Sequence, residues 1–131
     1  MTTHFLFVYG TLRQSGSNSL LKMYPNSRFV GNAAVCGRLY DLGDYPAILL
    51  DSSAAPVAGE VYEIDNDTLT ALDEFEASAG YGRKRIEILV HGERTPCLVY
   101  DPEPEMCEGK ELIGSGDWIK YSGSDLIRTS E

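Results

Sequence analysis

The sequence contains no hydrophobic run long enough to cross a membrane. A membrane-spanning helix needs about 20 consecutive apolar residues, and no apolar run in these 131 residues approaches that length. The N-terminus also lacks a basic segment followed by a long apolar stretch, which is the pattern of a secretory signal peptide. We therefore expect one cytoplasmic domain, residues 1–131, without a membrane partner.

Positive charge is scarce as well. Eleven Lys and Arg residues are outnumbered by 20 Asp and Glu residues, which gives a net charge of −9. Proteins that bind nucleic acids or anionic membrane surfaces need basic patches. The charge balance therefore argues against both kinds of partner, although it does not identify a ligand.

Cysteine is present without a pairing pattern. Cys36, Cys97 and Cys107 are an odd number, no CxxC occurs, and His4 and His91 lie far apart. These features favour free thiols and argue against a structural zinc site. Cys36 and Cys97 lie in apolar runs, so we expect both in the core. A cysteine hydrolase built from Cys97 and His91 would need a third, orienting residue, and none is evident.

The N-terminal region contains the most distinctive apolar run. Residues 5–9 are all apolar or aromatic and end at Gly10. A run that is apolar on both faces indicates a buried strand. Gly10 lets the backbone turn tightly or approach a ligand, and a Ser/Gly/Asn loop follows through Asn18. Such a loop can direct N–H groups at an anion, but the residue types alone favour an ordinary turn. Neither GxGxxG nor GxxxxGK[ST] is present, which weakens a nucleotide-binding interpretation.

Most of the remaining chain has the pattern of short strands. We expect strands at 29–40, 47–50, 57–64, 85–91 and 95–100, helical turns at 20–24, and turns at 41–46, 81–84 and 92–94. Residues 101–110 form a Pro/Glu-rich loop that we expect to be solvated and mobile. We expect residues 112–121 to pack against the rest of the domain through Trp118. A helical turn is expected around Leu126 and Ile127. Short strands with one main helix indicate a small α+β barrel.

The main helix, predicted over residues 68–76, contains an unusual carboxylate. Residues 65–67 supply candidate N-caps. At 100° per residue, Leu69, Leu72 and Phe75 form the apolar stripe, and Glu76 falls about 20° from Leu69 and about 40° from Leu72. Glu76 is therefore the charged residue that this helix directs toward the interior.

A buried carboxylate is costly unless it is paired or has a raised pKa, and such groups are enriched in functional sites. Two structural explanations stay open for Glu76. The helix can end before Glu76 and leave the side chain in water, or Arg83 or Arg85 can pair with it. Glu60, within the strand at 57–64, is the second candidate carboxylate, although an outward-facing, solvated position is the commoner case.

Three motifs now stand in order along the chain. They are Val-Tyr-Gly-Thr-Leu-Arg at 8–13, Gly-Glu-Val-Tyr-Glu-Ile-Asp at 59–65, and Leu-Asp-Glu-Phe-Glu at 72–76 followed by Tyr-Gly-Arg at 81–83. Gly-Asp-Tyr-Pro at 43–46 and Ser-Gly-Asp-Trp at 115–118 add to the set. The ordered set resembles the gamma-glutamylcyclotransferase-like family, in particular its gamma-glutamylamine cyclotransferase branch and bacterial relatives.

The resemblance implies an α+β fold, a small mixed β-barrel with a few flanking helices, and chemistry without a metal or organic cofactor. It implies that Glu76 is the catalytic general base and acid. It places the substrate-binding loop at Tyr9, Gly10, Thr11 and Leu12, with Tyr45, Glu60 and Tyr81 as further pocket-lining candidates.

The substrate implied by the resemblance is a small γ-glutamyl amine or dipeptide, which would be cyclised to 5-oxoproline with release of the amine. We expect a monomer or a weak homodimer. A competing hypothesis is a non-catalytic module that binds a small acidic metabolite with the same loop, in which Glu76 is a structural acid paired with an arginine.

Overall fold

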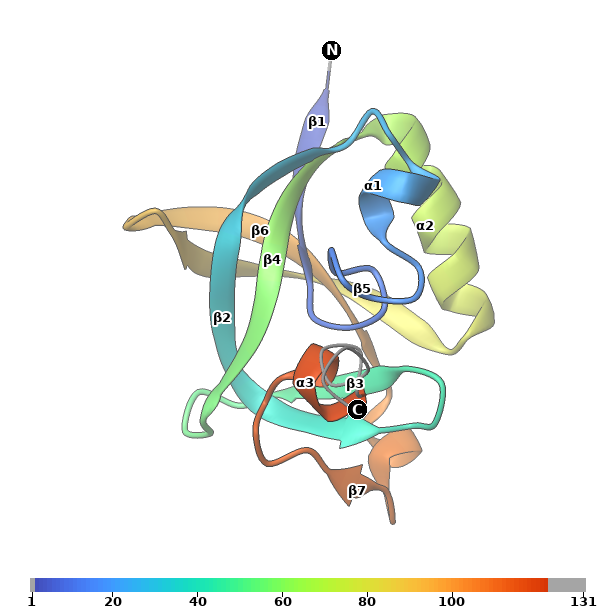
Figure 1. The fold of residues 1–131 in the computed structure, drawn as a ribbon, viewed down its shortest axis with the longest axis vertical. Coiled ribbons are helices and arrows are strands. Elements are labelled where there is room, and N and C mark those ends of the chain that lie inside the picture. Colours follow the sequence, from blue (N-terminus) through green and yellow to red (C-terminus); the bar gives the residue numbers. More distant parts are fainter. Residues whose placement is uncertain (1, 123–131) are drawn as a thin grey trace, which may run out of the picture.

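The computed structural model describes residues 2–122, and its strands form one curled sheet (Figure 1). The strands are β1 (Thr3–Val8), β2 (Arg28–Asp41), β3 (Pro46–Leu50), β4 (Pro56–Asp65), β5 (Tyr81–Val90), β6 (Glu93–Pro102) and β7 (Glu111–Leu112). Their order is β3-β2-β4-β1-β6-β5, and β7 pairs with β2. The β1–β6 pair is parallel and the other strand pairs are antiparallel. The predicted α+β fold with a mixed barrel-like sheet is confirmed, and the sheet curls into a half-barrel.

The helices are few and short. They are α1 (Leu20–Met23), α2 (Asn66–Ser78), the 3₁₀ helix η1 (Pro104–Cys107) and α3 (Trp118–Ser122). Figure 1 shows α2 along one side of the sheet, and α1 and α2 contribute to the same apolar cluster. None of the helices in residues 2–122 is long and apolar enough to span a membrane. The helical turn expected around Leu126 and Ile127 lies outside the described residues.

The sheet has an apolar core on each face. In β1, Phe7 is buried in one cluster, and Leu6 and Val8 are buried in the other, together with Leu72 of α2. The prediction that this strand is buried on both faces is confirmed. Tyr9, which follows β1, is buried in the first cluster. The end of β1 is therefore fixed from two sides, which gives the loop after it a rigid base.

Helix α2 begins and ends with recognisable signals. The Asp65 carboxylate accepts a hydrogen bond from the Thr68 N–H at 2.8 Å, so Asp65 is the N-cap. The helix continues to Ser78, and Gly80 follows with a φ of +89°, a conformation that favours glycine. Leu72 is fully buried as expected, but Phe75 is 49% exposed, so its place in the core stripe was wrongly predicted.

Several predicted loops are structured. Tyr81 already pairs with Pro102, so the expected turn at 81–84 is the start of β5. The expected mobile loop at 101–110 is also wrong, because Asp101 and Cys107 are buried and residues 104–107 form η1. The Cys107 side chain packs into the second core, and this contact anchors a segment whose composition suggested a solvated loop.

Two smaller expectations also differ from the structure. The β5–β6 turn is made by His91 and Gly92, both with positive φ, which is one residue earlier than expected and fits a two-residue type I′ turn. Cys36 is exposed rather than buried, because its position on β2 falls in an alternating pattern with the side chain outward.

Candidate active site

A cavity of about 360 Å³ opens between the loop after β1, the turn before β3, the last turns of α2, and strands β5 and β6. Its floor consists of buried residues, namely Phe7, Val8, Tyr9, Gly10, Leu12, Pro46, Tyr81 and Tyr100. Its rim consists of exposed residues, namely Ser17, Asn18, Asp44, Tyr45 and Phe75. Thr11, Glu76 and Ala79 lie between the two. The size suits a small ligand.

The loop after β1 lines this cavity and contains N–H groups without a hydrogen-bond partner among residues 2–122. The carbonyls of Gly10, Thr11 and Leu12 accept hydrogen bonds from backbone N–H groups further along the chain, at 2.9–3.1 Å. The N–H groups of the same three residues donate no hydrogen bond to another residue within 2–122. Successive N–H groups that converge on one point can bind an anion.

Gly10 is required by a close approach. A Cβ at this position would lie 2.7 Å from the Cδ and Cγ atoms of Pro46, which is shorter than real side-chain contacts allow. The loop therefore packs directly against Pro46, the first residue of β3, and both residues line the cavity.

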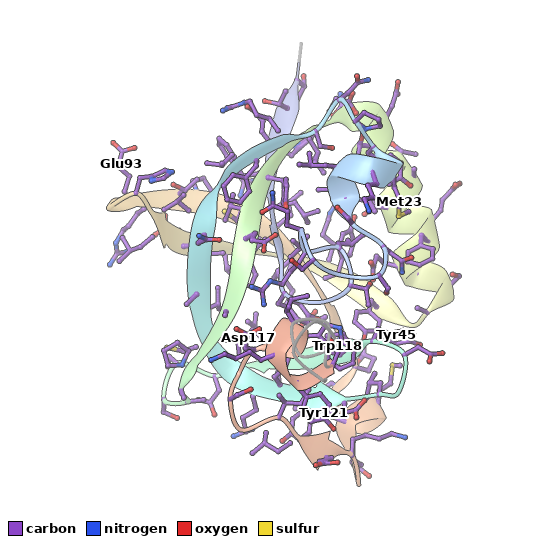
Figure 2. All side chains as sticks on the ribbon, in the orientation of Figure 1. Met23, Tyr45, Glu93, Asp117, Trp118 and Tyr121 are labelled. Atoms are coloured by element: carbon purple, nitrogen blue, oxygen red, sulfur yellow. The ribbon has the colours of Figure 1, made fainter. Side chains whose placement is uncertain are left out.

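Glu60 is hydrogen-bonded to the loop after β1. Its carboxylate accepts hydrogen bonds from the Arg13 side chain at 3.2 Å, the Gln14 backbone N–H at 2.9 Å and the Tyr62 hydroxyl at 2.9 Å. Arg13 also donates to Asp117 at 2.9 Å, and Figure 2 labels Asp117 beside Trp118, the first residue of α3. We call Arg13, Glu60 and Asp117 the loop brace.

The position of Glu60 corrects two expectations. The side chain is buried, with the residue only 5% exposed, rather than solvated on an outer face. It is also not among the residues that line the cavity. The sequence could not reveal this role, because the donors to Glu60 include groups on a loop 46 and 47 residues earlier in the chain.

Glu76 differs from Glu60 both in its position and in its hydrogen bonding. It lies in the last turn of α2 and in the wall of the cavity, half-buried, and its side chain makes no hydrogen bond or ion pair with another residue of the described chain. Removal from water raises the pKa of the Glu76 carboxyl to about 7.

Both structural explanations for Glu76 are wrong. The helix does not end before Glu76 but continues to Ser78. Arg83 binds Asp73 at 2.7 Å instead of Glu76, and Arg85 is exposed and makes no ion pair with Glu76. Glu76 is thus a partly desolvated, unpaired carboxyl group in the wall of the cavity.

Three tyrosine hydroxyls in the cavity wall donate hydrogen bonds to other protein groups. The Tyr9 hydroxyl donates to the Tyr100 carbonyl at 2.7 Å, the Tyr81 hydroxyl donates to the Pro46 carbonyl at 2.7 Å, and the Tyr100 hydroxyl donates to Asp73 at 2.7 Å. Burial raises the pKa of all three above the ordinary tyrosine value, so they stay neutral. Tyr100 was missed by sequence reasoning, because nothing in the strand pattern distinguishes it from a core residue.

The cysteine hydrolase hypothesis is contradicted by the positions of its two residues. Cys97 is 1% exposed in the first core, and burial raises the pKa of its thiol to about 11. His91 is exposed at the β5–β6 turn, and its Nε2 lies 2.7 Å from the Val30 carbonyl oxygen. Across residues 2–122, no group of three or more His, Cys, Asp or Glu side chains is arranged to hold a metal ion.

Comparison with known proteins identifies the family of this chain. Residues 6–120 match the family described as "Gamma-glutamyl cyclotransferase, AIG2-like". The chain is 35% identical over 116 residues to the gamma-glutamylcyclotransferase family protein YtfP of Escherichia coli K12, an alignment that covers 87% of this chain and 95% of that protein. The solution structure of ytfP from Escherichia coli has a TM-score of 0.62 at 34% identity, covering 90% of this chain and 98% of that one.

Two further relatives are named by their reactions. The gamma-L-glutamyl-butirosin B gamma-glutamyl cyclotransferase of Niallia circulans is 42% identical over 81 residues, which is 61% of this chain and 50% of that protein. The gamma-glutamylaminecyclotransferase of Bos taurus is 35% identical over 114 residues, which is 72% of this chain and 63% of that protein. The resemblance read from the ordered motifs is thereby confirmed, and the chain belongs to the gamma-glutamyl cyclotransferase, AIG2-like family.

Proposed function

We propose that this protein is a gamma-glutamyl cyclotransferase that converts a γ-glutamyl amine or dipeptide into 5-oxoproline and a free amine, with Glu76 as general base and then general acid. One observation carries the proposal. Glu76 is an unpaired, partly desolvated carboxyl group in the wall of a cavity that is also lined by Gly10, Thr11 and Leu12, whose N–H groups have no partner among residues 2–122.

The reaction is intramolecular. The α-nitrogen of the γ-glutamyl group attacks its own γ-carbonyl carbon, the new C–N bond closes the five-membered ring, and the C–N bond to the leaving amine breaks. Starting from the ammonium form, the α-nitrogen loses two protons and the leaving nitrogen gains two. Charge is conserved, and Glu76 returns to its original state after transferring protons between the two nitrogens.

The pKa of Glu76 suits this task. A general base and acid works best when its pKa lies near the working pH, and about 7 is much closer to neutrality than the ~4.3 of a free glutamate. Because the carboxylate must be ionised to accept the first proton, the rate is expected to rise with pH and to level off above about pH 7.

The loop has a separate role in this proposal. Its N–H groups hold the substrate's α-carboxylate or stabilise the oxyanion that develops on the γ-carbonyl oxygen. One well-placed donor of this kind is worth about 3 kcal/mol in the transition state. The cavity has only to enforce the bent conformation in which the two reacting atoms meet.

Two other expectations fit the same proposal. Cys36, Cys97 and Cys107 are all free thiols, which agrees with the predicted cytoplasmic location. A monomer or a weak homodimer stays the oligomeric state that we expect for this enzyme.

The test measures, by mass spectrometry, the release of 5-oxoproline from a panel of γ-glutamyl amines and dipeptides. The wild-type protein and Glu76→Gln are compared, with Glu74→Gln as control, because Glu74 is an exposed acid on the same helix and not part of the cavity wall. We expect product from the wild type and the control alone. A protein that binds 5-oxoproline but releases none from any substrate would favour the non-catalytic module.

A further inference from the structure

The three tyrosine hydroxyls of the cavity wall lie near Glu76 but do not donate to it. They belong to Tyr9, Tyr81 and Tyr100, and each donates to another protein group at 2.7 Å. Burial is the main cause of the raised pKa of all three, and the nearby charge of Glu76 raises each pKa further. Because a hydroxyl has a single proton, none of the three can donate to Glu76 at the same time.

The acceptor of the Tyr100 hydroxyl differs in kind from the other two acceptors. The Tyr9 and Tyr81 hydroxyls donate to backbone carbonyls, those of Tyr100 and Pro46. The Tyr100 hydroxyl donates instead to a side chain, the carboxylate of Asp73 in α2. Of the three contacts, this one alone depends on the identity of the accepting residue.

Asp73 binds a second donor as well. One of its carboxylate oxygens accepts from the Tyr100 hydroxyl, and the other accepts from the Arg83 guanidinium at 2.7 Å. Arg83 of β5 and Tyr100 of β6 are direct partners in the strand register, so their side chains leave the sheet on the same face. Asp73 therefore occupies both donors that this point of the strand pair directs at α2.

Glu76 lies next to Asp73 on the helix. The two residues are three positions apart in α2, and residues at this spacing are neighbours with about 5–6 Å between their Cβ atoms. Glu74, between them in the sequence, is exposed and is not part of the cavity wall. If Asp73 did not bind the two donors, Glu76 would be the neighbouring carboxyl group to receive them.

The other titratable groups around the cavity supply no positive charge. Asp44 and Tyr45 lie at its exposed rim, and no Lys, Arg or His is among the described residues that line it. The Cys107 thiol, near the tyrosine at the start of β5, stays neutral because burial raises its pKa. Lys84 pairs with the buried Asp101 at 2.6 Å. These groups leave the state of the carboxyl group in the wall unchanged.

We infer that Asp73 is a positioning residue, which binds two donors of the β5–β6 pair and thereby withholds them from Glu76. This inference rests on the proposed function, because an acid that exchanges protons with a substrate must not be satisfied by its own protein. A hydrogen bond or a cation at the Glu76 carboxylate would favour the ionised form and lower its pKa. Asp73 therefore preserves the raised pKa that burial gives to Glu76.

The test is an NMR titration of the glutamate side-chain carboxyl carbons, in which the Glu76→Gln protein identifies the signal of Glu76. Asp73→Ala should lower the pKa of Glu76 from about 7 by at least about one pKa unit, because a cation beside a carboxyl group lowers its pKa by about 1–3 units. The rising limb of the pH profile of kcat/KM should move to lower pH by the same amount. Asp73→Asn keeps the size of the side chain but releases Arg83, so it should shift the pKa in the same direction even if Asp73→Ala does not fold.

A triple variant separates the release of donors from a simple loss of charge. Asp73→Ala combined with Tyr100→Phe and Arg83→Gln lacks the acid and both donors. The pKa of Glu76 in this protein should return to about 7, the wild-type value. If Asp73 acted only through its negative charge, the pKa would stay lowered in the triple variant. Glu74→Gln removes an exposed charge of the same helix and should leave the pKa of Glu76 unchanged.

Failure of the inference differs from failure of the proposed function. A wild-type pKa of Glu76 in both Asp73 variants, or a lowered pKa in the triple variant, would overturn the role of Asp73. Because the titration needs no substrate, that result would leave the cyclotransferase intact. If no γ-glutamyl compound gave 5-oxoproline, the proposed function would fail, and the titration would still decide whether Asp73 withholds the two donors.

Discussion

Glu60 and Glu76 are both carboxylates withdrawn from water, and they differ in what surrounds them. Glu60 is 5% exposed and accepts hydrogen bonds from the Arg13 guanidinium, a backbone N–H and a tyrosine hydroxyl. Glu76 is half-buried, and its side chain has no such donor in the part of the chain that the structure describes. The two residues lie on consecutive elements, β4 and α2.

In the proposed mechanism, this difference separates a structural acid from a reactive one. Three donors satisfy Glu60, so its charge is used to hold the loop after β1. Glu76 has lost water without gaining a donor, and the pKa of its carboxyl is raised to about 7 in consequence. A carboxyl group in that state is free to exchange protons with a ligand in the cavity. The comparison predicts that removing Glu76 harms chemistry and that removing Glu60 harms folding.

The largest expected effect is on turnover. Glu76→Gln should lower kcat by about 10²–10⁴-fold, which is the usual contribution of a general base or acid, because glutamine cannot take up the proton. The measurement is 5-oxoproline release with the best substrate of the panel. Glu74→Gln should keep wild-type turnover, and a Glu76→Gln protein that retained wild-type kcat would contradict the assigned role.

The second effect concerns the loop brace. Glu60→Gln should lower the free energy of unfolding by about 3 kcal/mol, because it leaves the largely buried Arg13 with one carboxylate partner fewer. Urea denaturation measures this value. Glu63→Gln is the matched control on the same strand, since Glu63 pairs with the exposed Arg28 and such pairs contribute less than about 1 kcal/mol. Equal losses in the two variants would show that burial of Glu60 does not matter.

The third effect is the pH dependence of stability. A carboxyl group whose pKa is raised on folding contributes stability that is complete below its unfolded pKa, about 4.5, and is lost as the pH rises through its folded pKa, about 7. Relative to wild type, Glu76→Gln should therefore gain stability between pH 4.5 and 7. The gain is at most about 3 kcal/mol at pH 8, from 1.36 kcal/mol per pKa unit.

Thermal or urea unfolding of both proteins at pH 4 and pH 8 provides the measurement. The two curves should nearly coincide at pH 4 and separate at pH 8, with the variant more stable. A stability difference that did not change with pH would mean that ionisation of Glu76 does not destabilise the folded protein.

The smallest effect concerns the helix that carries Glu76. Asp65→Ala removes the acceptor for the Thr68 N–H and should destabilise the protein by about 1 kcal/mol. Turnover at a temperature well below the melting point should be unchanged, because the Glu76 side chain is at the opposite end of the helix. A large loss of kcat in Asp65→Ala would show that the position of Glu76 depends on the whole helix rather than on its last turn.

The sequence predicted those features that depend on local pattern. The continuous apolar run of β1 predicted a buried strand, the residue pattern at 85–91 and 95–100 predicted the strands β5 and β6, and the helical periodicity directed Glu76 inward. The motif order predicted the family. The strand and helix signals each lie within a few neighbouring residues, where backbone geometry alone decides which side chains share a face.

Features that depend on contacts between distant segments were missed. Nothing near Glu60 in the sequence reveals that Arg13 and Gln14 will reach it, so its role could not be predicted. The Pro/Glu-rich stretch after β6 contains Cys107, which packs into the second core although the composition around it is that of a solvated loop. Phe75 follows the helical period closely, and yet its side chain is half exposed where it lines the cavity.

The loop brace also sets an order of events during synthesis. Arg13 pairs with Asp117, 104 residues further along the chain, and β1 pairs with both β4 and β6. The loop therefore leaves the ribosome long before the groups that fix its shape. Contacts of such long sequence separation form late and slowly, so the segment translated early is among the last to reach its final conformation. The loop brace cannot be complete in the nascent chain until nearly the whole domain has emerged.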